Sequence, residues 1–158
     1  MITKAKVSDC DELTRVALTS KAHWGYTPEQ IESCRDDLTV TPDMFEKYEI
    51  NKSLSQGRIA AFHILNLEGK SDQCTLEFLF VSPEFIGKRR GRALLKYAFI
   101  IAKCHQKKSM RVLSDPNAES FYAKYGFNVI EQKESSIAGR FLPLMERDLS
   151  DIELNPVV

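Results

Sequence analysis

Hydrophobic positions recur along this chain with two periods, one typical of strands and one typical of helices. Apolar runs and apolar–polar alternation predict strands at residues 2–7, 47–52, 57–67, 76–81, 110–113, 127–132 and 140–149. Helical spacing predicts helices that begin after Ser8 or Asp9, at Pro28, just after Arg92 and at Asp115, with a short turn at 41–44. Strands that alternate with helices in the middle, and follow one another at both ends, predict a mixed α/β sheet of six to seven strands with helices on both faces.

Length and composition predict one globular domain. The chain has 158 residues, of which 43% are hydrophobic and 28% charged, which is enough for one core and too short for two ordinary domains. We expect the domain to span residues 1–149 and residues 150–158 to form a loose tail.

Charge and cysteine usage exclude several classes of function. Lys plus Arg and Asp plus Glu both number 22, so no overall field attracts nucleic acid or a membrane. The start lacks the apolar core of a signal peptide and no segment approaches the length of a membrane span, so we expect a cytoplasmic protein. The four cysteines are irregularly spaced and form no ligand pairs with the three histidines, which indicates free thiols and no metal site.

The segment 76–95 carries the first chemical signal. An apolar strand ends at Ser82-Pro83, a turn rich in glycine and basic residues follows, and Ala93-Leu94-Leu95 opens a helix. The start of a helix exposes unpaired backbone N–H groups and the positive end of the helix dipole, so anions bind there. The turn adds the four cations Lys88, Arg89, Arg90 and Arg92. Phosphate is the natural ligand; the alternative is a solvated basic loop that only joins two elements.

Two motifs resemble those of the GNAT (general control-related N-acetyltransferase) superfamily. The turn Ile86-Gly87-Lys88-Arg89-Arg90-Gly91 is similar to the acetyl-coenzyme A loop Gln/Arg-x-x-Gly-x-Gly/Ala, from which Ile86 and Arg89 depart. Residues 115–127 resemble the motif Asn-x-x-Ala-x-x-Phe-Tyr-x-Lys-x-Gly-Phe: Asp115 stands at the position of its Asn, and the other named positions match at Ala118, Phe121, Tyr122, Lys124, Gly126 and Phe127. The order of predicted elements agrees with the GNAT fold up to Leu149.

This resemblance implies an acetyl-coenzyme A-dependent N-acetyltransferase that needs no metal. Acetyl transfer to an amine can proceed by direct attack when both reactants are held in line. The resemblance implies that the pantetheine arm follows a strand that splays from its neighbour, and that the pyrophosphate lies on the basic turn. The implied coenzyme A contacts are Leu79, Phe80, Val81, Gly87, Lys88, Arg89, Arg90, Gly91, Arg92, Ala93, Asn117, Phe121 and Lys124.

Two residues are candidates for proton transfer. Tyr122 matches the family tyrosine that donates a hydrogen bond or proton to the sulfur of coenzyme A; its helical spacing alone is equally compatible with core packing. Glu77 is the only charged residue within residues 76–81. Burial in an apolar strand is costly for a carboxylate unless it forms an ion pair or takes part in catalysis. Desolvation would raise its pKa toward that of a general base, but it could equally be an ion-pair partner.

The acceptor site has weaker candidates. Trp24 and Tyr26 lie in the segment that usually helps to form the acceptor wall in this superfamily, although both rings could simply pack the first helices onto the sheet. His63 lies in a strand, where a satisfied core histidine is more common than a catalyst. Arg140 could bind an acceptor carboxylate, but a surface salt bridge is the favoured interpretation.

The expected partner is a small-molecule or peptide amine, with neither nucleic acid nor membrane, in a possible homodimer. Alternatives are a non-catalytic acyl-coenzyme A sensor, an acyltransferase with another acyl donor, or an oxygen acceptor. The sequence does not identify the acceptor, because the expected wall falls in the least recognisable segment.

Overall fold

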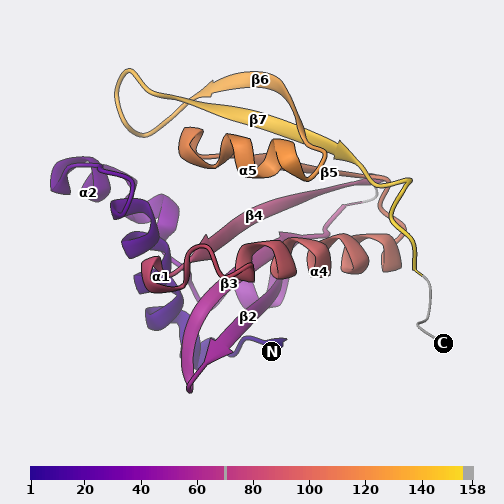
Figure 1. Ribbon diagram of the computed structural model, residues 1–158, viewed down its shortest axis with the longest axis horizontal. Coiled ribbons are helices and arrows are strands. Elements are labelled where there is room, and N and C mark those ends of the chain that lie inside the picture. The colour runs from indigo at the N-terminus through magenta and orange to yellow at the C-terminus, as the bar shows by residue number, and fades with distance from the viewer. Residues whose placement is uncertain (70, 155–158) are drawn as a thin grey trace.

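One mixed sheet organises the computed structural model, which describes residues 1–69 and 71–154. Within these ranges seven strands lie in the order β1-β2-β3-β4-β5-β7-β6 (Figure 1). They are β1 (Ile2–Lys4), β2 (Glu49–Ser55), β3 (Arg58–Asn66), β4 (Gln73–Val81), β5 (Ser109–Leu113), β6 (Asn128–Glu134) and β7 (Phe141–Asp148). β4 and β5 are parallel, and the other neighbours are antiparallel. The predicted sheet class and strand number are confirmed.

Local sequence explains where the helices begin. The helices are α1 (Cys10–Ala22), α2 (Pro28–Leu38), α3 (Met44–Lys47), α4 (Arg90–Cys104) and α5 (Glu119–Lys124). Thr27 caps α2 by accepting a hydrogen bond from the Gln30 N–H, with Pro28 at the first helical position. Asp115 caps a short 3₁₀ turn, Pro116–Ala118, and not α5 itself. The helix predicted from Asp115 therefore starts later, at Glu119.

Two hydrophobic cores lie on opposite faces of the sheet. Leu13 and Val16 of α1 pack with Phe62 and Ile64 of β3 on one face. On the other face, side chains of α4 and α5 pack with β3, β4, β5 and β7: Leu65, Leu76, Leu95, Phe99, Val112, Tyr122 and Met145. Alternate residues of a strand point to opposite faces, so β3 contributes to both cores. Helices cover both faces, as the sequence predicts (Figure 1).

A bulge in β4 changes which face its side chains occupy. Leu76 lies opposite Leu65 and Phe78 lies opposite Ile64, so Glu77 has no partner residue on β3. Before the bulge, Leu76 packs into the core beneath α4 and α5. After it, Phe78 packs against the core beneath α1 and α2. Simple alternation would place Leu76 and Phe78 on the same face, so the bulge reverses the alternation at Glu77.

The start of the predicted tail is attached to the domain. The Asp151 carboxylate forms an ion pair with Arg147, and Ile152 packs against the core beneath α4 and α5. The loose tail predicted from residue 150 is therefore wrong for these two residues, and residues 155–158 lie outside those described. No helix in the described part of the chain combines the length and hydrophobicity needed to cross a membrane.

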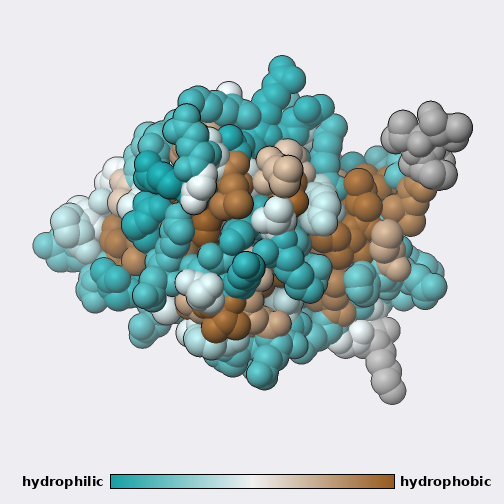
Figure 2. Space-filling view, turned by 90° about the horizontal axis from the view of Figure 1, so that it is seen from below, coloured by the Kyte–Doolittle hydropathy of each residue, from teal (hydrophilic) through white to brown (hydrophobic). Residues whose placement is uncertain are grey.

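Polar residues cover most of one broad face of the molecule. Seen from below the view of Figure 1, hydrophobic residues on this face form separate patches between hydrophilic ones (Figure 2).

Candidate active site

The sheet splits between its two parallel strands. β4 pairs with β5 only over Gln73–Leu76, opposite Ser109–Val112, whereas β4 continues along β3 to Val81. Residues 77–81 therefore have backbone N–H and C=O groups that point away from β3 and have no neighbouring strand to form hydrogen bonds with. The split lies at the carboxyl ends of the parallel pair, where open α/β sheets bind ligands.

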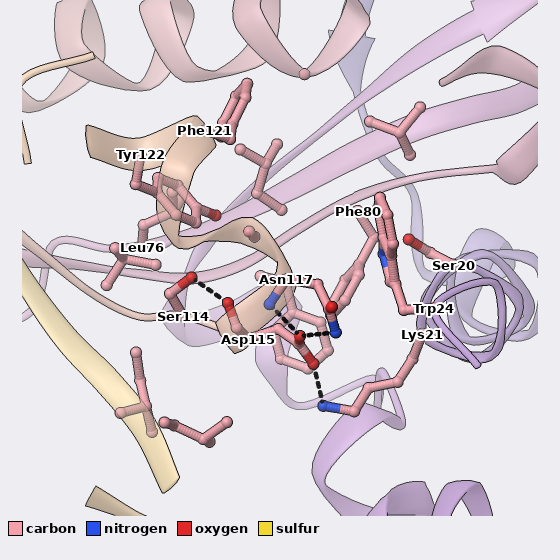
Figure 3. Close-up of a pocket in the computed structure, with 18 of the residues that line it drawn as sticks. Ser20, Lys21, Trp24, Leu76, Phe80, Ser114, Asp115, Asn117, Phe121 and Tyr122 are labelled. Atoms are coloured by element: carbon pink, nitrogen blue, oxygen red, sulfur yellow. Dashed lines mark hydrogen bonds and ion pairs between the residues drawn. The ribbon is translucent and has the colours of Figure 1, made fainter. Parts of the chain in front are cut away.

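A cleft of about 1040 Å³ occupies this split and reaches both faces of the sheet. Most of the predicted site residues line it: Trp24, Glu77, Leu79, Phe80, Val81, Gly87, Arg89, Arg90, Gly91, Arg92, Asn117, Phe121, Tyr122 and Lys124. Lys88, Ala93 and Tyr26 do not. Figure 3 shows residues of α1, β4 and α5 around the cleft.

Tyr122 lies in the inner wall of the cleft. Only 4% of its surface is exposed, and its ring packs edge-on against Phe121 and Phe127. Its hydroxyl points toward the centre of the cleft (Figure 3) and has no hydrogen-bond partner among residues 1–69 and 71–154. Burial raises the pKa of the phenol, so Tyr122 stays protonated and can donate a hydrogen bond or proton to a ligand atom.

Glu77 lies at the bulge and is exposed within the cleft. The expectation of a carboxylate enclosed in an apolar strand is therefore wrong, because the bulge takes Glu77 out of the regular alternation. The protein around the cleft still partly desolvates it. This burial raises the pKa of Glu77, and a hydrogen bond with the Asn66 side chain partly opposes the rise. No ion pair with Glu77 occurs in the described part of the chain, so the ion-pair alternative finds no partner.

The basic turn is built around two left-handed residues. Gly87 has φ +85° and Arg89, the residue before α4, has φ +61°. A glycine is usual in this conformation, and the family motif has one where this chain has Arg89. A Cβ at Gly91 would make ordinary van der Waals contact, 3.4 Å from Val81 Cγ2 and 3.5 Å from Phe121 Cζ, so the packing of α4 on β4 and α5 does not itself require glycine here.

The basic side chains of the turn have different roles. The Arg90 guanidinium donates to Ser53 Oγ at 2.7 Å and to the Leu54 carbonyl, and it stacks on the Phe85 ring. Arg90 therefore holds the turn against the β2–β3 hairpin, while Lys88 lies over Phe85 outside the cleft. Arg89 and Arg92 line the cleft, and neither forms an ion pair with a described residue.

Backbone donors for an anion come from the first turn of α4. By helix geometry, the N–H groups of Arg90, Gly91 and Arg92 have no partner within the helix. The Ala93 N–H already donates to the Arg89 carbonyl at 3.0 Å. Ala93 is therefore unsuited to the anion-binding role expected for it, since its N–H closes the first helical hydrogen bond.

A polar cluster that sequence reasoning missed borders the cleft. Asp115 accepts hydrogen bonds from the Lys21 ammonium at 2.8 Å and from the Asn117 side chain (Figure 3). It also accepts one from the Tyr26 hydroxyl, at 2.8 Å. Burial alone would raise the pKa of Asp115, but Lys21 and the Asn117 N–H lower it overall. Lys21 and Asp115 are 94 positions apart, and no local pattern links them.

Tyr26 supports the cluster and does not form the cleft wall. Its pKa is raised to about 12 by burial and by the neighbouring Asp115 carboxylate. Arg140 stacks over the Tyr26 ring at 4.7 Å and donates to its hydroxyl, in place of the expected surface salt bridge. Trp24, by contrast, lines the cleft with 45% of its surface exposed.

His63 is a satisfied core residue. Its ring nitrogens are hydrogen-bonded to the Asn51 side chain and the Leu94 carbonyl, and the side chain is fully buried. Burial lowers its pKa to about 4, partly opposed by the Leu94 hydrogen bond, so the ring is neutral at pH 7. It does not line the cleft.

The split parallel pair, the adjacent helix start and the tyrosine in the wall define an α/β protein with a ligand cleft at the sheet's centre. Residues 26–147 match the family model described as the acetyltransferase (GNAT) domain, and the chain belongs to this family. It is accordingly an N-acetyltransferase, of a family whose co-substrate is acetyl-coenzyme A. No curated protein sequence matches significantly.

Solved structures of the same fold include three acetyl-transferring enzymes. PaiA N-acetyltransferase from Thermoplasma acidophilum, crystallised with coenzyme A, is 23% identical with a TM-score of 0.73 over 94% of this chain and 98% of its own. The ribosomal-protein-S18-alanine N-acetyltransferase from Escherichia coli is 19% identical, with a TM-score of 0.70 over 100% and 99%. N-acetylglutamate synthase from Neisseria gonorrhoeae, complexed with coenzyme A and N-acetyl-glutamate, is 17% identical with a TM-score of 0.67 over 94% of this chain and 35% of its own.

Proposed function

We propose that this protein transfers the acetyl group of acetyl-coenzyme A to a primary amine by direct attack in a ternary complex. The amine nitrogen attacks the thioester carbonyl carbon, so a C–N bond forms and the C–S bond breaks. Glu77 accepts the ammonium proton, directly or through water, and Tyr122 donates a proton to the departing thiolate. The nitrogen loses its second proton as the amide forms, Tyr122 is reprotonated, and one proton is released to solvent overall.

The observation that carries this proposal is the Tyr122 hydroxyl. The Tyr122 side chain is almost fully buried, but its protonated hydroxyl has no partner among the described residues and is accessible from the cleft. A ligand atom beside this hydroxyl could accept its hydrogen bond in a site that the surrounding protein partly shields from water. A sulfur atom in the cleft would meet this donor.

The surroundings suit coenzyme A along the rest of the cleft. The unpaired backbone edge of Leu79, Phe80 and Val81 can hydrogen-bond to the amides of the pantetheine arm. The N–H groups at the start of α4, with Arg89 and Arg92 beside them, suit the pyrophosphate. On the other wall, Asn117, Phe121 and Lys124 complete the proposed donor site.

Calorimetric titration with acetyl-coenzyme A tests the donor site, with dephospho-coenzyme A and ATP as controls. We expect binding that Arg92→Glu weakens and that Lys103→Glu, three turns further along α4, leaves unchanged. Absence of acetyl-coenzyme A binding at low salt would refute the proposed donor site.

A further inference from the structure

The two openings of the cleft carry opposite charge. The cations of its lining other than Lys21 lie on the α4 and α5 side: Arg89, Arg90, Arg92 and Lys124. The opposite side is formed by α1, α2 and the end of β6, and there the lining includes Asp37 and Glu134. Glu77 lies on β4 between the two sides. An anionic donor and a cationic acceptor would thus each meet the opposite charge.

The negative charge on the α1 and α2 side is not neutralised by neighbours. Lys21 and Asp115 form an ion pair and cancel each other. Asp37 accepts a hydrogen bond from the neutral Ser136 hydroxyl, and the Glu134 side chain has no ion pair or hydrogen bond with any described residue. Arg140, the nearby cation, stacks on Tyr26 and does not line the cleft. Two carboxylates therefore remain uncompensated on this side.

Two further features identify this side as a binding surface. The Tyr122 side chain is only 4% exposed, and its hydroxyl, which has no partner among the described residues, points into the same cleft and marks where the reacting atoms would lie. The half-exposed Trp24 ring also lines the cleft, in the turn just after α1. Aromatic faces attract ammonium groups, so Trp24 adds to the same preference for a cation.

The β6–β7 loop limits the size of the acceptor. Ile137 is 7% exposed and packs into the core beneath α1 and α2, which anchors the loop on that face of the sheet. Contacts of Ser136 with Asp37 and of Arg140 with Tyr26 hold the loop on both sides of Ile137. A loop held across this opening suits a small, flexible molecule better than a folded protein chain.

From these features we infer that the acceptor is a small aliphatic di- or polyamine, a substrate class that rests on the proposed acetyltransferase function. One amine reacts beside Tyr122 and Glu77. The second ammonium binds between Asp37 and Glu134, with Trp24 beside the connecting chain. Acceptors with a carboxylate at that position are rejected, because the two carboxylates there would repel it.

Steady-state kinetics with matched acceptors test this inference. The four-carbon set compares a monoamine, a diamine and an aminocarboxylate: butylamine, 1,4-diaminobutane and 4-aminobutanoate. A second set compares the corresponding six-carbon monoamine, diamine and aminocarboxylate. We expect kcat/KM for the better diamine to exceed that of its monoamine about tenfold, with the aminocarboxylate lower again. Asp37→Asn and Glu134→Gln should each reduce the diamine-to-monoamine ratio severalfold, whereas Asp36→Asn, which removes a charge from α2 outside the cleft, should preserve it.

A binding measurement separates this inference from the proposed function. Trp24 is the only tryptophan in the sequence, so its fluorescence reports acceptor binding with or without turnover. In protein saturated with coenzyme A, 1,4-diaminobutane should change the fluorescence at lower concentration than butylamine. Equal responses to the two amines, or equal kcat/KM values, would overturn the polyamine inference while acetyl transfer itself stands. Diamine binding without any acetyl transfer would refute the catalytic function and leave the cation site.

Discussion

The ammonium of Lys21 lies 2.8 Å from the Asp115 carboxylate, and this ion pair joins α1 to the loop that carries Asn117. Both side chains are largely buried, at 11% and 16% exposure. The pair therefore connects the acceptor side of the cleft with the wall proposed to hold the coenzyme.

Removing the cation should destabilise the protein. In Lys21→Met, Asp115 keeps its Tyr26 and Asn117 partners but loses its counter-charge, so we expect the free energy of unfolding to fall by about 1–3 kcal/mol. Urea denaturation measures this. Lys4→Met is the control, because the Lys4–Glu49 pair is solvent-exposed and should contribute under about 1 kcal/mol. Equal losses in the two variants would show that the buried pair has no special role.

Tyr122→Phe should separate catalysis from packing. Phenylalanine keeps the ring contacts with Phe121 and Phe127 but cannot donate a proton, so kcat should fall about 100-fold or more while acetyl-coenzyme A affinity changes little. Tyr97→Phe, which lies outside the cleft, is the matched control. An unchanged kcat in Tyr122→Phe would exclude Tyr122 as the acid.

Glu77 predicts the acidic limb of the pH–rate profile. A general base must be deprotonated, so the rate should rise with pH through a pKa above the ordinary value for Glu, because the cleft partly desolvates this carboxylate. Glu77→Gln should lower kcat and abolish this limb. The ionised Glu77 carboxylate should not stabilise the fold, because its raised pKa means that the folded state disfavours the charged form. Glu77→Gln should therefore be no less stable than the parent protein at pH 7. Persistence of the limb in Glu77→Gln would assign it to another group.

Arg89 allows backbone strain and charge to be tested separately. Arg89→Gly and Arg89→Ala both remove the cation, but only glycine adopts φ +61° without steric cost. We expect the glycine variant to be about 1 kcal/mol more stable than the alanine variant. Both should bind acetyl-coenzyme A more weakly than the parent protein, and by the same factor. Unchanged affinity in both variants would show that the Arg89 charge does not contact the coenzyme.

The neutral core histidine predicts a loss of stability in acid. Its pKa falls from 6.5 to about 4 on folding, so between these values the unfolded chain binds a proton that the folded chain does not. Stability contributed by His63 should be present above pH 6.5 and decline toward pH 4, by up to about 1.4 kcal/mol per pH unit. Urea midpoints across this range should show a shallower slope in His63→Gln. An unaltered slope would mean that other titrating groups, and not His63, determine the pH dependence of stability in this range.

Local signals in the sequence predicted most helices and strands, but they could not predict the contacts between distant parts of the chain. The Gln56-Gly57 turn lies where the strand pattern places it, and both residues have positive φ, as a tight hairpin requires. Within the motif at residues 115–127, Asn117, Phe121, Tyr122 and Lys124 line the cleft, as predicted. The period of two could not reveal the bulge at Glu77, because hydrophobicity is the same on both sides of it.

Long-range contacts account for the remaining differences. Basic residues in a turn look equivalent in a sequence, yet Arg90 is held by Ser53 of the β2–β3 hairpin, 37 positions earlier. Tyr26 was expected in the acceptor wall, and its contacts with Asp115 and Arg140 depend on residues 89 and 114 positions away. Only the folded sheet brings these partners together.

The strand order also has a consequence for biosynthesis. β7 is the last of these seven strands to leave the ribosome, yet it lies between β5 and β6 in the sheet. A nascent chain that ends before Phe141 has no neighbour for β6 and leaves one edge of β5 open. The first four strands can pair with their sequence neighbours as they emerge, but the wall of the cleft beyond β5 cannot assemble until β7 has been synthesised. A nascent chain that stops before β7 thus lacks the part of the cleft lining that Leu142 of β7 supplies.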